Sequence, residues 1–345
     1  SQGDSDGDGW IDCLTIIHSG HGEEWSGNPA TLIWSHQWEL QTVNTKDGVK
    51  MLRYHTSPAL RGETINTNII RIGVICHEMG HFFGLPDLYD YSNKTLGIGA
   101  WGIMAFGSWN GGDGKSPAHF CAWSKYMLGF LQPERMHSQT GVSLQSASLY
   151  PIAHMYRDGM ADGEYFLVEN RTKSGFDNSS NISPGIIIYH INEKSNNNDL
   201  DIWPHPVVKI EEADGNDSLG LQNVVSEPGD VWNSGSGIAG GFRDQTGNQT
   251  TNAMSYQTGY YSRSDDPVFY SYITLDNFSA AGETMTYDAK TLRASVLSQT
   301  VTQPDYSVSW PASANASMYE LQEGVPVTLA SFSDGAENED FMYDN

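Results

Sequence analysis

Apolar residues form two short runs near the N-terminus of the chain. Residues 13–20, CLTIIHSG, predict a buried strand that ends at a glycine, and residues 31–38, TLIWSHQW, predict a second strand. This part of the chain is therefore expected to contribute strands to a sheet.

Two longer apolar patterns predict helices. From Asn68 the run NIIRIGVICHEMGHFFG is almost continuously apolar and long enough for a buried helix, which Gly84 and Pro86 should end. Residues 116–130, SPAHFCAWSKYMLGF, predict an amphipathic helix with Pro117 near its first turn.

Beyond Pro133 short strands alternate with turn-forming residues, so this half should be predominantly β. The expected strands are EYFLVENR (164–171), GIIIYHIN (185–192), VVKIEEADG (207–215), YITLDNFS (272–279) and TMTYDA (284–289). Residues 230–265 are rich in Gly, Ser, Asn and Thr and are expected to form long surface loops.

Together these patterns predict an α+β fold in three parts. Residues 1–132 combine a mixed sheet with a buried helix, and residues 133–289 form a β-rich part. Residues 290–345 include YSVSWPASANASMYELQEG, which resembles the opening strands of a fibronectin type III module. The remaining chain is too short for a whole module, so an incomplete β-sandwich is expected there.

Charge narrows the classes of function. The net charge is −24, from 42 acidic and 18 basic residues, which disfavours binding to nucleic acid or to anionic membranes and suits binding of cations. No apolar run approaches the roughly 18 residues of a membrane span, so membrane insertion is not expected. The three cysteines, Cys13, Cys76 and Cys121, are expected to be buried.

The central motif of the sequence is CHEMGH, within the predicted buried helix. Residues four apart on a helix lie on one face, so His77 and His81 can direct two imidazole nitrogens at a single metal ion. Glu78 projects from the adjoining face, where it would reach a water on that metal as general base. This H-E-x-x-H pattern is typical of zinc peptidases, and the alternative is a pair of helix histidines capped by a glutamate.

The residues after the motif predict a third ligand. Gly84 would let the helix end in a left-handed turn, and Pro86 would prevent the helix from resuming. Asp87 then follows, ten residues after His77, where a returning loop could present its carboxylate. Asp90 is a competitor by spacing. Three protein ligands with one open position are the pattern of catalytic rather than structural zinc.

The segments HEMGHFFGLPDLYD (77–90) and GIMAFGSWNGGDGKSPAHFCAWSKYMLGF (102–130) resemble the immune inhibitor A family of secreted bacterial metallopeptidases. The resemblance continues more weakly through the β segments and covers roughly residues 4–289. It implies a metzincin-like catalytic region at residues 1–132, with the zinc signature H-E-x-x-H-x-x-G-x-x-D. It also implies that Met104 is the Met-turn methionine, which lies beneath the metal ligands.

The resemblance further implies secretion, a removed propeptide, protein or peptide substrates and a monomeric enzyme. A chain that starts at Ser1 fits a matured or trimmed form with the N-terminal part of the catalytic region missing. One departure concerns the tyrosine that several metzincins carry two residues after the Met-turn methionine. That position is Phe106 here, so a tyrosine at the metal would have to come from elsewhere.

A second metal site is predicted in the N-terminal loop DSDGDGWID. Asp4, Asp6, Asp8 and Asp12 and the carbonyl of Trp10 follow the alternate spacing of an EF-hand-type calcium loop. The glutamate expected at the twelfth position is absent and no helix precedes the loop, so a non-helical structural calcium site is expected. The alternative is an acidic, solvated turn.

The leading hypothesis is therefore a secreted zinc endopeptidase that hydrolyses proteins through a zinc-bound water activated by Glu78. The alternatives are a calcium-stabilised adhesion or carbohydrate-binding protein with a vestigial metal site, and a zinc hydrolase that acts on other bonds. Glu23 and Glu24 follow the first predicted strand at a glycine turn. If they line the cleft, they would favour basic or polar substrate side chains.

Overall fold

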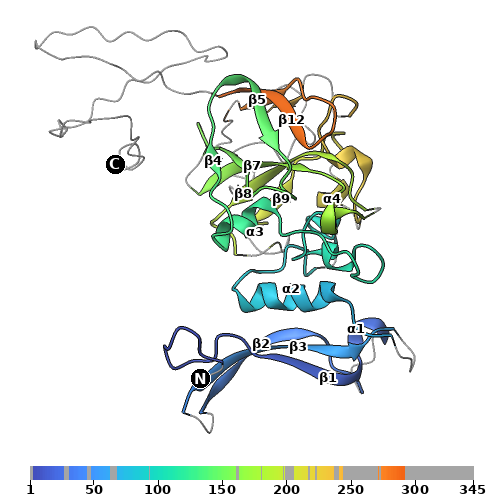
Figure 1. Cartoon of the computed structure of the whole chain (residues 1–345). Helices are drawn as coiled ribbons and strands as arrows, with labels where there is room; N and C mark the ends of the chain where they lie inside the picture. The colour runs from blue at the N-terminus through green and yellow to red at the C-terminus, as the bar shows by residue number, and fades with distance from the viewer. Residues whose placement is uncertain are drawn as a thin grey trace, which may run out of the picture. The chain divides into compact units, whose positions relative to one another are not determined.

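The computed structural model describes most of the chain up to Thr291 (Figure 1). The described residues are 3–26, 31–44, 48–62, 68–92, 94–160, 163–179, 181–196, 198, 206–216, 218–221, 224–236, 241–243, 271 and 273–291. All of these described residues belong to one compact unit. The predicted fibronectin-III-like tail and most of the predicted loops at 230–265 lie outside the described residues.

The first sheet is mixed and has the strand order β1-β3-β2. Its strands are β1 (Thr15–His21), β2 (His36–Asn44) and β3 (Lys50–Leu60). β3 pairs in parallel with β1 and antiparallel with β2. Pro58 can occupy the central strand because the β2 pairing starts at Thr56, so that its missing N–H breaks no bond on that side.

Helix α2 (Ile72–Phe82) packs on β3 and β2, as Figure 1 shows, and also contacts the 3₁₀ turn η2 (Phe106–Trp109). The short helix α1 (Glu23–Ser26) directly follows β1. Another 3₁₀ turn, η1 (Gly99–Trp101), precedes η2 and is fully buried. The metal motif is thus on a helix that lies between a sheet and a compact pair of turns.

The second and third sheets occupy the part after residue 133. A five-stranded sheet has the order β4-β6-β7-β8-β9, and its strands are Glu134–Arg135, His154–Tyr156, Glu164–Arg171, Gly185–Asn192 and Val208–Ile210. A four-stranded sheet has the order β10-β11-β12-β5, and its strands are Phe242–Arg243, Thr274–Asp276, Thr284–Lys290 and Gln139–Gln145. The short elements beside them are α3 (Ala122–Met127), η3 (Gly175–Asp177), α4 (Ser218–Leu221) and η4 (Pro228–Asp230).

The hydrophobic core is built around β7 and β8, which are buried at every residue. They pair antiparallel from Glu164 opposite Asn192 to Arg171 opposite Gly185. Burial on both faces explains the apolar run at the centre of each strand, YFLV in β7 and IIIY in β8.

The observed sheets with few, short helices agree with the coarse expectation of an α+β protein, whereas several element boundaries differ. The second predicted strand begins at His36 rather than residue 31, and residue 33 forms only an isolated bridge to Gly22. The helix predicted at 116–130 is observed only as α3. Cys121 has an extended backbone, so the helix cannot begin before Ala122. Cys121 is buried and Cys76 half-buried, but Cys13 is exposed, so the expected burial is wrong there.

No helix among the described residues combines the length and the apolar character that a membrane span requires.

Candidate metal centre

His77 and His81 lie one turn apart on α2, and the backbone fixes the orientation of both rings. The Nδ1–H of His77 donates to the carbonyl of Ile103, and that of His81 to the carbonyl of Leu85, each at 2.8 Å. These bonds place the proton of each neutral ring on Nδ1 and leave Nε2 with a free lone pair. The two Nε2 atoms lie 3.1 Å apart. In this tautomer neither carries a proton, so no hydrogen bond joins them.

A tight turn at the end of α2 brings the third side chain to the pair. Gly84 has φ +96°, the left-handed region that glycine accepts without strain. The N–H of Gly84 donates to the carbonyl of His81, and the N–H of Leu85 to that of Gly80, which together form a Schellman motif. The chain reverses here and carries Asp87 back toward the histidines.

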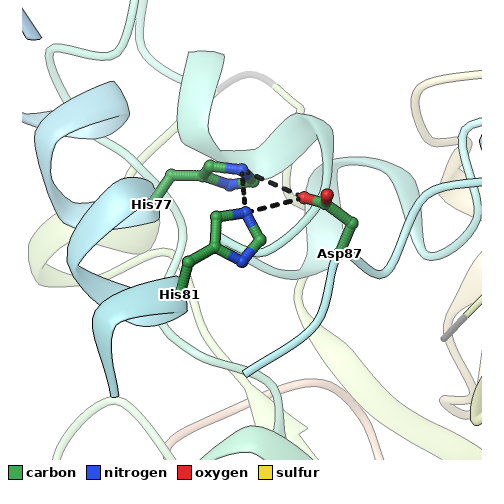
Figure 2. A group of neighbouring side chains, drawn as sticks. All are labelled: His77, His81 and Asp87. Atoms are coloured by element: carbon green, nitrogen blue, oxygen red, sulfur yellow. Dashed lines mark hydrogen bonds and ion pairs between the residues drawn. The ribbon is translucent and has the colours of Figure 1, made fainter. Parts of the chain in front are cut away.

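Asp87 completes a triangle of ligand atoms, as Figure 2 shows. Its Oδ1 lies 3.1 Å from the Nε2 of His77 and 3.1 Å from that of His81. Despite these distances, Oδ1 is buried and has no hydrogen-bond partner, because neither contact has hydrogen-bond geometry. Burial alone would raise the pKa of Asp87. In the metal-free centre an imidazole that is also protonated at Nε2 outweighs this effect, and the two histidines then hold the pKa of Asp87 below the ordinary value.

The donor set fits a zinc ion. A tetrahedral zinc with bonds of about 2.0–2.1 Å separates its ligand atoms by about 3.3 Å, close to the 3.1 Å of the triangle. Three atoms whose lone pairs point toward one another at such short distances repel one another unless a cation lies among them. The two Nδ1–H bonds supply the outer support that metal-bound histidines usually have.

Asp90 was the other candidate for the third ligand by its spacing, but its carboxylate binds elsewhere. Its Oδ1 accepts from the N–H of Ser92, and its Oδ2 accepts from the hydroxyl of Ser92 and the N–H of Lys94. The carboxylate therefore shapes the following turn. The structure brings Asp87, not Asp90, to the imidazoles.

Met104 lies under α2 and is 1 % exposed. A Cβ on Gly80 would come within 2.3 Å of the Met104 sulfur, so the helix can approach this side chain only because residue 80 is a glycine. The carbonyl of Met104 accepts from the N–H of Leu88, one residue past Asp87. The segment around Met104 thus supports both His77, through Ile103, and the loop that carries Asp87.

Glu78 is 5 % exposed and lines a cavity of about 430 Å³ next to the triangle. Burial raises the pKa of Glu78, and the neighbouring His77 and His81 offset part of that rise. A carboxylate with a raised pKa is a better proton acceptor than a solvated one. The cavity is also lined by Glu24, Trp34, Ser35, Val74, His77, Tyr89, Leu96, Ala105, Phe106, Ser108 and Trp109.

Two tyrosines at this centre were not predicted. The hydroxyl of Tyr91 donates to the Oδ2 of Asp87, the oxygen that faces away from the triangle. Tyr89 stacks on His77 with ring centroids 6.4 Å apart and lines the cavity, and burial raises its pKa. Their positions two and four residues after Asp87 were the available signal, but without the fold nothing distinguishes them from other loop tyrosines.

The N-terminal aspartates form a second cluster. One carboxylate oxygen from each of Asp4, Asp6 and Asp8 lies within 4.8 Å of the other two. Backbone N–H groups of the same loop donate to all three side chains, two of them to Asp4. The loop is therefore folded around these carboxylates.

The other two predicted calcium ligands have different surroundings. The Oδ2 of Asp12 accepts from both the N–H and the hydroxyl of Ser5, at 2.8 and 2.6 Å. Trp10 forms a β-bridge with Lys50, whose ammonium lies 5.2 Å from the centre of its ring. The contacts of Trp10 attach the loop to the start of β3.

The structure thus places a histidine pair on one helix, with a nearby carboxylate and an adjacent buried glutamate, an arrangement that is typical of H-E-x-x-H metal sites. Residues 2–133 match the family model described as immune inhibitor A peptidase M6, catalytic domain. The resemblance to the immune inhibitor A family is thereby confirmed over this region, which includes His77, His81 and Asp87.

Two relatives with reported names align over 129 residues at 38% identity. One is the pre-pro-metalloprotease PrtV of Vibrio cholerae serotype O1 (strain M66-2), where the alignment covers 35% of this chain and 14% of the relative. The other is immune inhibitor A of Bacillus thuringiensis subsp. alesti, with 34% and 18% covered. The chain thus matches less than a fifth of the length of either relative.

Proposed function

We propose that this protein is a zinc-dependent endopeptidase that hydrolyses peptide bonds in proteins. The observation that carries the proposal is the triangle of two Nε2 atoms and one buried carboxylate oxygen, with Glu78 in the adjoining cavity. The family match and the name of the Vibrio cholerae relative, a metalloprotease, support it.

The three ligands His77, His81 and Asp87 would hold the zinc ion. Such an ion, when bound, polarises a carbonyl oxygen and lowers the pKa of a coordinated water to about 7. The role of the surrounding fold is to keep the three ligand atoms together, which the bonds to Ile103 and Leu85 and the hydroxyl of Tyr91 achieve.

Glu78 would be the proton carrier of the reaction. Its carboxylate takes a proton from the attacking water and then returns it to the amine that leaves, a transfer that its raised pKa favours. Because the side chain is buried beside the ligands, bulk water does not compete for the proton. The phenol of Tyr89 faces the same cavity and remains protonated, so it can donate a hydrogen bond to a bound peptide.

A direct experiment combines zinc analysis with cleavage of casein. We expect about one zinc per chain, casein cleavage, and inhibition by phenanthroline that added zinc reverses. His77→Ala should lose both zinc and cleavage, whereas the matched control His18→Ala, on β1, should keep both. Zinc without cleavage of any protein or peptide would favour a hydrolase for other bonds. A folded protein that binds no zinc would favour the adhesion or carbohydrate-binding alternative.

We also propose a structural calcium ion in the N-terminal loop, held by Asp4, Asp6 and Asp8 with further oxygens from Trp10 and Asp12. The mutual approach of three carboxylates supports the site, because without a cation they repel one another. Calcium should raise the melting temperature, and Asp6→Asn should remove most of that increase. An unchanged melting temperature on calcium titration would contradict the proposal.

Secretion, removal of a propeptide and a monomeric state belong to the same proposal. Secretion agrees with a calcium-stabilised loop, since calcium near millimolar levels is found outside cells. Detection of the protein in culture medium after removal of cells would test it.

A further inference from the structure

We propose that Glu24 makes the cavity beside the metal centre selective for a basic side chain, lysine or arginine, of the peptide substrate. The inference rests on the proposed peptidase function and specifies the substrate class of that site. The cavity contains two carboxylates from different elements, Glu78 of α2 and Glu24 of α1. Since Glu78 is assigned to proton transfer, Glu24 has no role in the chemistry and is available for recognition.

Glu24 is held in a fixed position at the cavity wall. The hydroxyl of Ser35 donates to its Oε1 at 2.7 Å, and the N–H of Ser35 donates to its Oε2 at 3.3 Å. Ser35 is 2 % exposed and itself lines the cavity, so these bonds anchor the carboxylate from behind. The carboxylate also lies against Gly22, where a Cβ would come within 2.2 Å of it.

The anchored carboxylate keeps capacity for a ligand. Each carboxylate oxygen has two lone-pair directions, and Ser35 uses one on each oxygen. An ammonium or guanidinium group in the cavity can donate hydrogen bonds to the remaining lone pairs. Such charge-assisted bonds are stronger than neutral ones, and a guanidinium can make two in parallel.

The rest of the cavity suits the apolar stem of a long basic side chain. Trp34, Trp109, Val74 and Leu96 supply apolar walls, and Trp109 is held edge-on by Trp25 with ring centroids 5.1 Å apart. Lysine and arginine bury their methylene groups on such surfaces while the charged head reaches a polar partner. An indole face also attracts a cation directly.

The charge balance of the site points the same way. Neither lysine nor arginine is among the described residues that line the cavity. With a divalent ion bound, the charges of Asp87 and Glu78 cancel that of the metal, and Glu24 leaves the site with a net negative charge. The chain as a whole carries −24, which steers cationic segments toward it. An acidic side chain would be repelled, and a neutral one would leave Glu24 without its partner.

A purely structural role is the competing explanation, because Glu24 also holds Ser35 just before β2. The two explanations differ in what a substitution changes. A structural role predicts that loss of the carboxylate affects all substrates alike. Recognition predicts that it changes the ratio between substrates that differ only in charge.

The experiment uses matched fluorogenic peptides that carry lysine or its neutral analogue norleucine at each of the three positions on either side of the cleaved bond. In the zinc-loaded wild-type protein, we expect kcat/KM to be about tenfold higher for lysine than for norleucine at one position next to the bond, the size of one charge-assisted bond. Glu24→Gln, which can still accept from Ser35, should bring this ratio close to one. Glu24→Lys should favour glutamate at that position.

Glu23→Gln is the matched control, because Glu23 is the neighbouring glutamate of α1 and does not line the cavity. It should keep the wild-type ratio. A second measurement avoids turnover: in the zinc-loaded Glu78→Gln variant, calorimetry should show tighter binding of the lysine peptide, and the further Glu24→Gln change should remove the difference.

The outcomes separate the inference from the proposed function. Cleavage of both peptides with equal kcat/KM at all six positions in the wild type would overturn the role of Glu24 and leave the peptidase assignment intact. A lysine preference that survives in Glu24→Gln would also overturn it. Absence of cleavage of any peptide by the zinc-loaded protein would overturn the proposed function, and this inference with it.

Discussion

Two groups of ionisable side chains in the described part of the chain satisfy their polar atoms in opposite ways. In the triangle of His77, His81 and Asp87, three lone pairs meet and one buried carboxylate oxygen has no hydrogen-bond donor. Around Arg171, which is 0 % exposed, each guanidinium nitrogen donates: Nε and Nη2 to Asp177 and Nη1 to Glu169 and the carbonyl of Trp101.

The carboxylate of Glu169 in this group also has further hydrogen-bond donors. Lys125 lies 3.1 Å from the second oxygen of Glu169, and the hydroxyl of Tyr189 donates to the first. Although burial alone would raise the pKa of Glu169, the charges of Lys125 and Arg171 hold it below the ordinary value. Two cations thus face two carboxylates with matched bonds.

The presence or absence of matching hydrogen-bond donors distinguishes a structural group of charges from a group that binds a ligand. A network whose donors and acceptors are matched connects parts of the fold, here η1, η3, α3 and β7, and needs no ligand. A cluster that contains acceptors only is incomplete until a cation joins it. Substitutions should therefore affect stability in one group and chemistry or metal binding in the other.

The largest effect is expected from Glu78→Gln. Loss of the proton acceptor should lower kcat/KM for a peptide by about 10²–10⁴-fold. Zinc content and melting temperature should stay near wild type, because Glu78 is not among the ligand atoms of the triangle. Zinc analysis and peptide kinetics on the same sample check this. Activity within a few-fold of wild type would refute the assignment.

Arg171→Met should act in the opposite way. It leaves Glu169 and Asp177 buried without their main cation, which should lower the free energy of unfolding by about 3–5 kcal/mol. Denaturant titration measures this. The control Arg53→Met breaks an exposed pair with Glu39 and should cost less than about 1 kcal/mol. Equal losses in the two variants would contradict the comparison.

Tyr91→Phe tests the outer support of the triangle. Without its hydroxyl, Asp87 loses the donor on Oδ2, and the affinity for zinc should fall about 10–100-fold. Competition with a chromogenic chelator gives the affinity. Tyr150→Phe, at an exposed residue, should leave it unchanged. An unaltered affinity in Tyr91→Phe would show that the ligand needs no such support.

The smallest expected effect is a gradual change of the free energy of unfolding with pH. Buried His190 lies 2.8 Å from Glu164 and 3.1 Å from Glu211. Burial alone would lower the pKa of His190, but the two carboxylates outweigh it and raise the pKa to about 10. Because this pKa is raised on folding, its stabilisation is complete below the unfolded value of about 6.5 and is lost as the pH rises toward 10.

The free energy of unfolding should therefore decrease between pH 7 and pH 10, by at most about 1.4 kcal/mol per unit from this group. Denaturant titrations at several pH values measure the slope. In His190→Gln the contribution of this group to the slope should disappear. An identical slope in both proteins would show that His190 is neutral in the folded state.

Local patterns were sufficient to predict much of the fold. The predicted strands at 164–171 and 185–192 coincide with β7 and β8, because each has a central apolar run, YFLV and IIIY, as strands buried on both faces do. The helix predicted from residue 68 corresponds to α2, although it begins at Ile72. β3 was missed, because KMLRYHTSPAL has neither clean alternation nor a continuous apolar run and contains a proline.

The sequence by itself determined the pair His77 and His81, since four-residue spacing on a helix places two side chains on one face whatever the surroundings. It also determined the reversal at Gly84, which depends on the backbone freedom of a single residue. Only the tertiary structure decided that Asp87 rather than Asp90 approaches the imidazoles, and that Glu24 lies in the same cavity as Glu78. These contacts depend on how a loop and a distant helix pack against α2, and no local periodicity encodes such long-range packing.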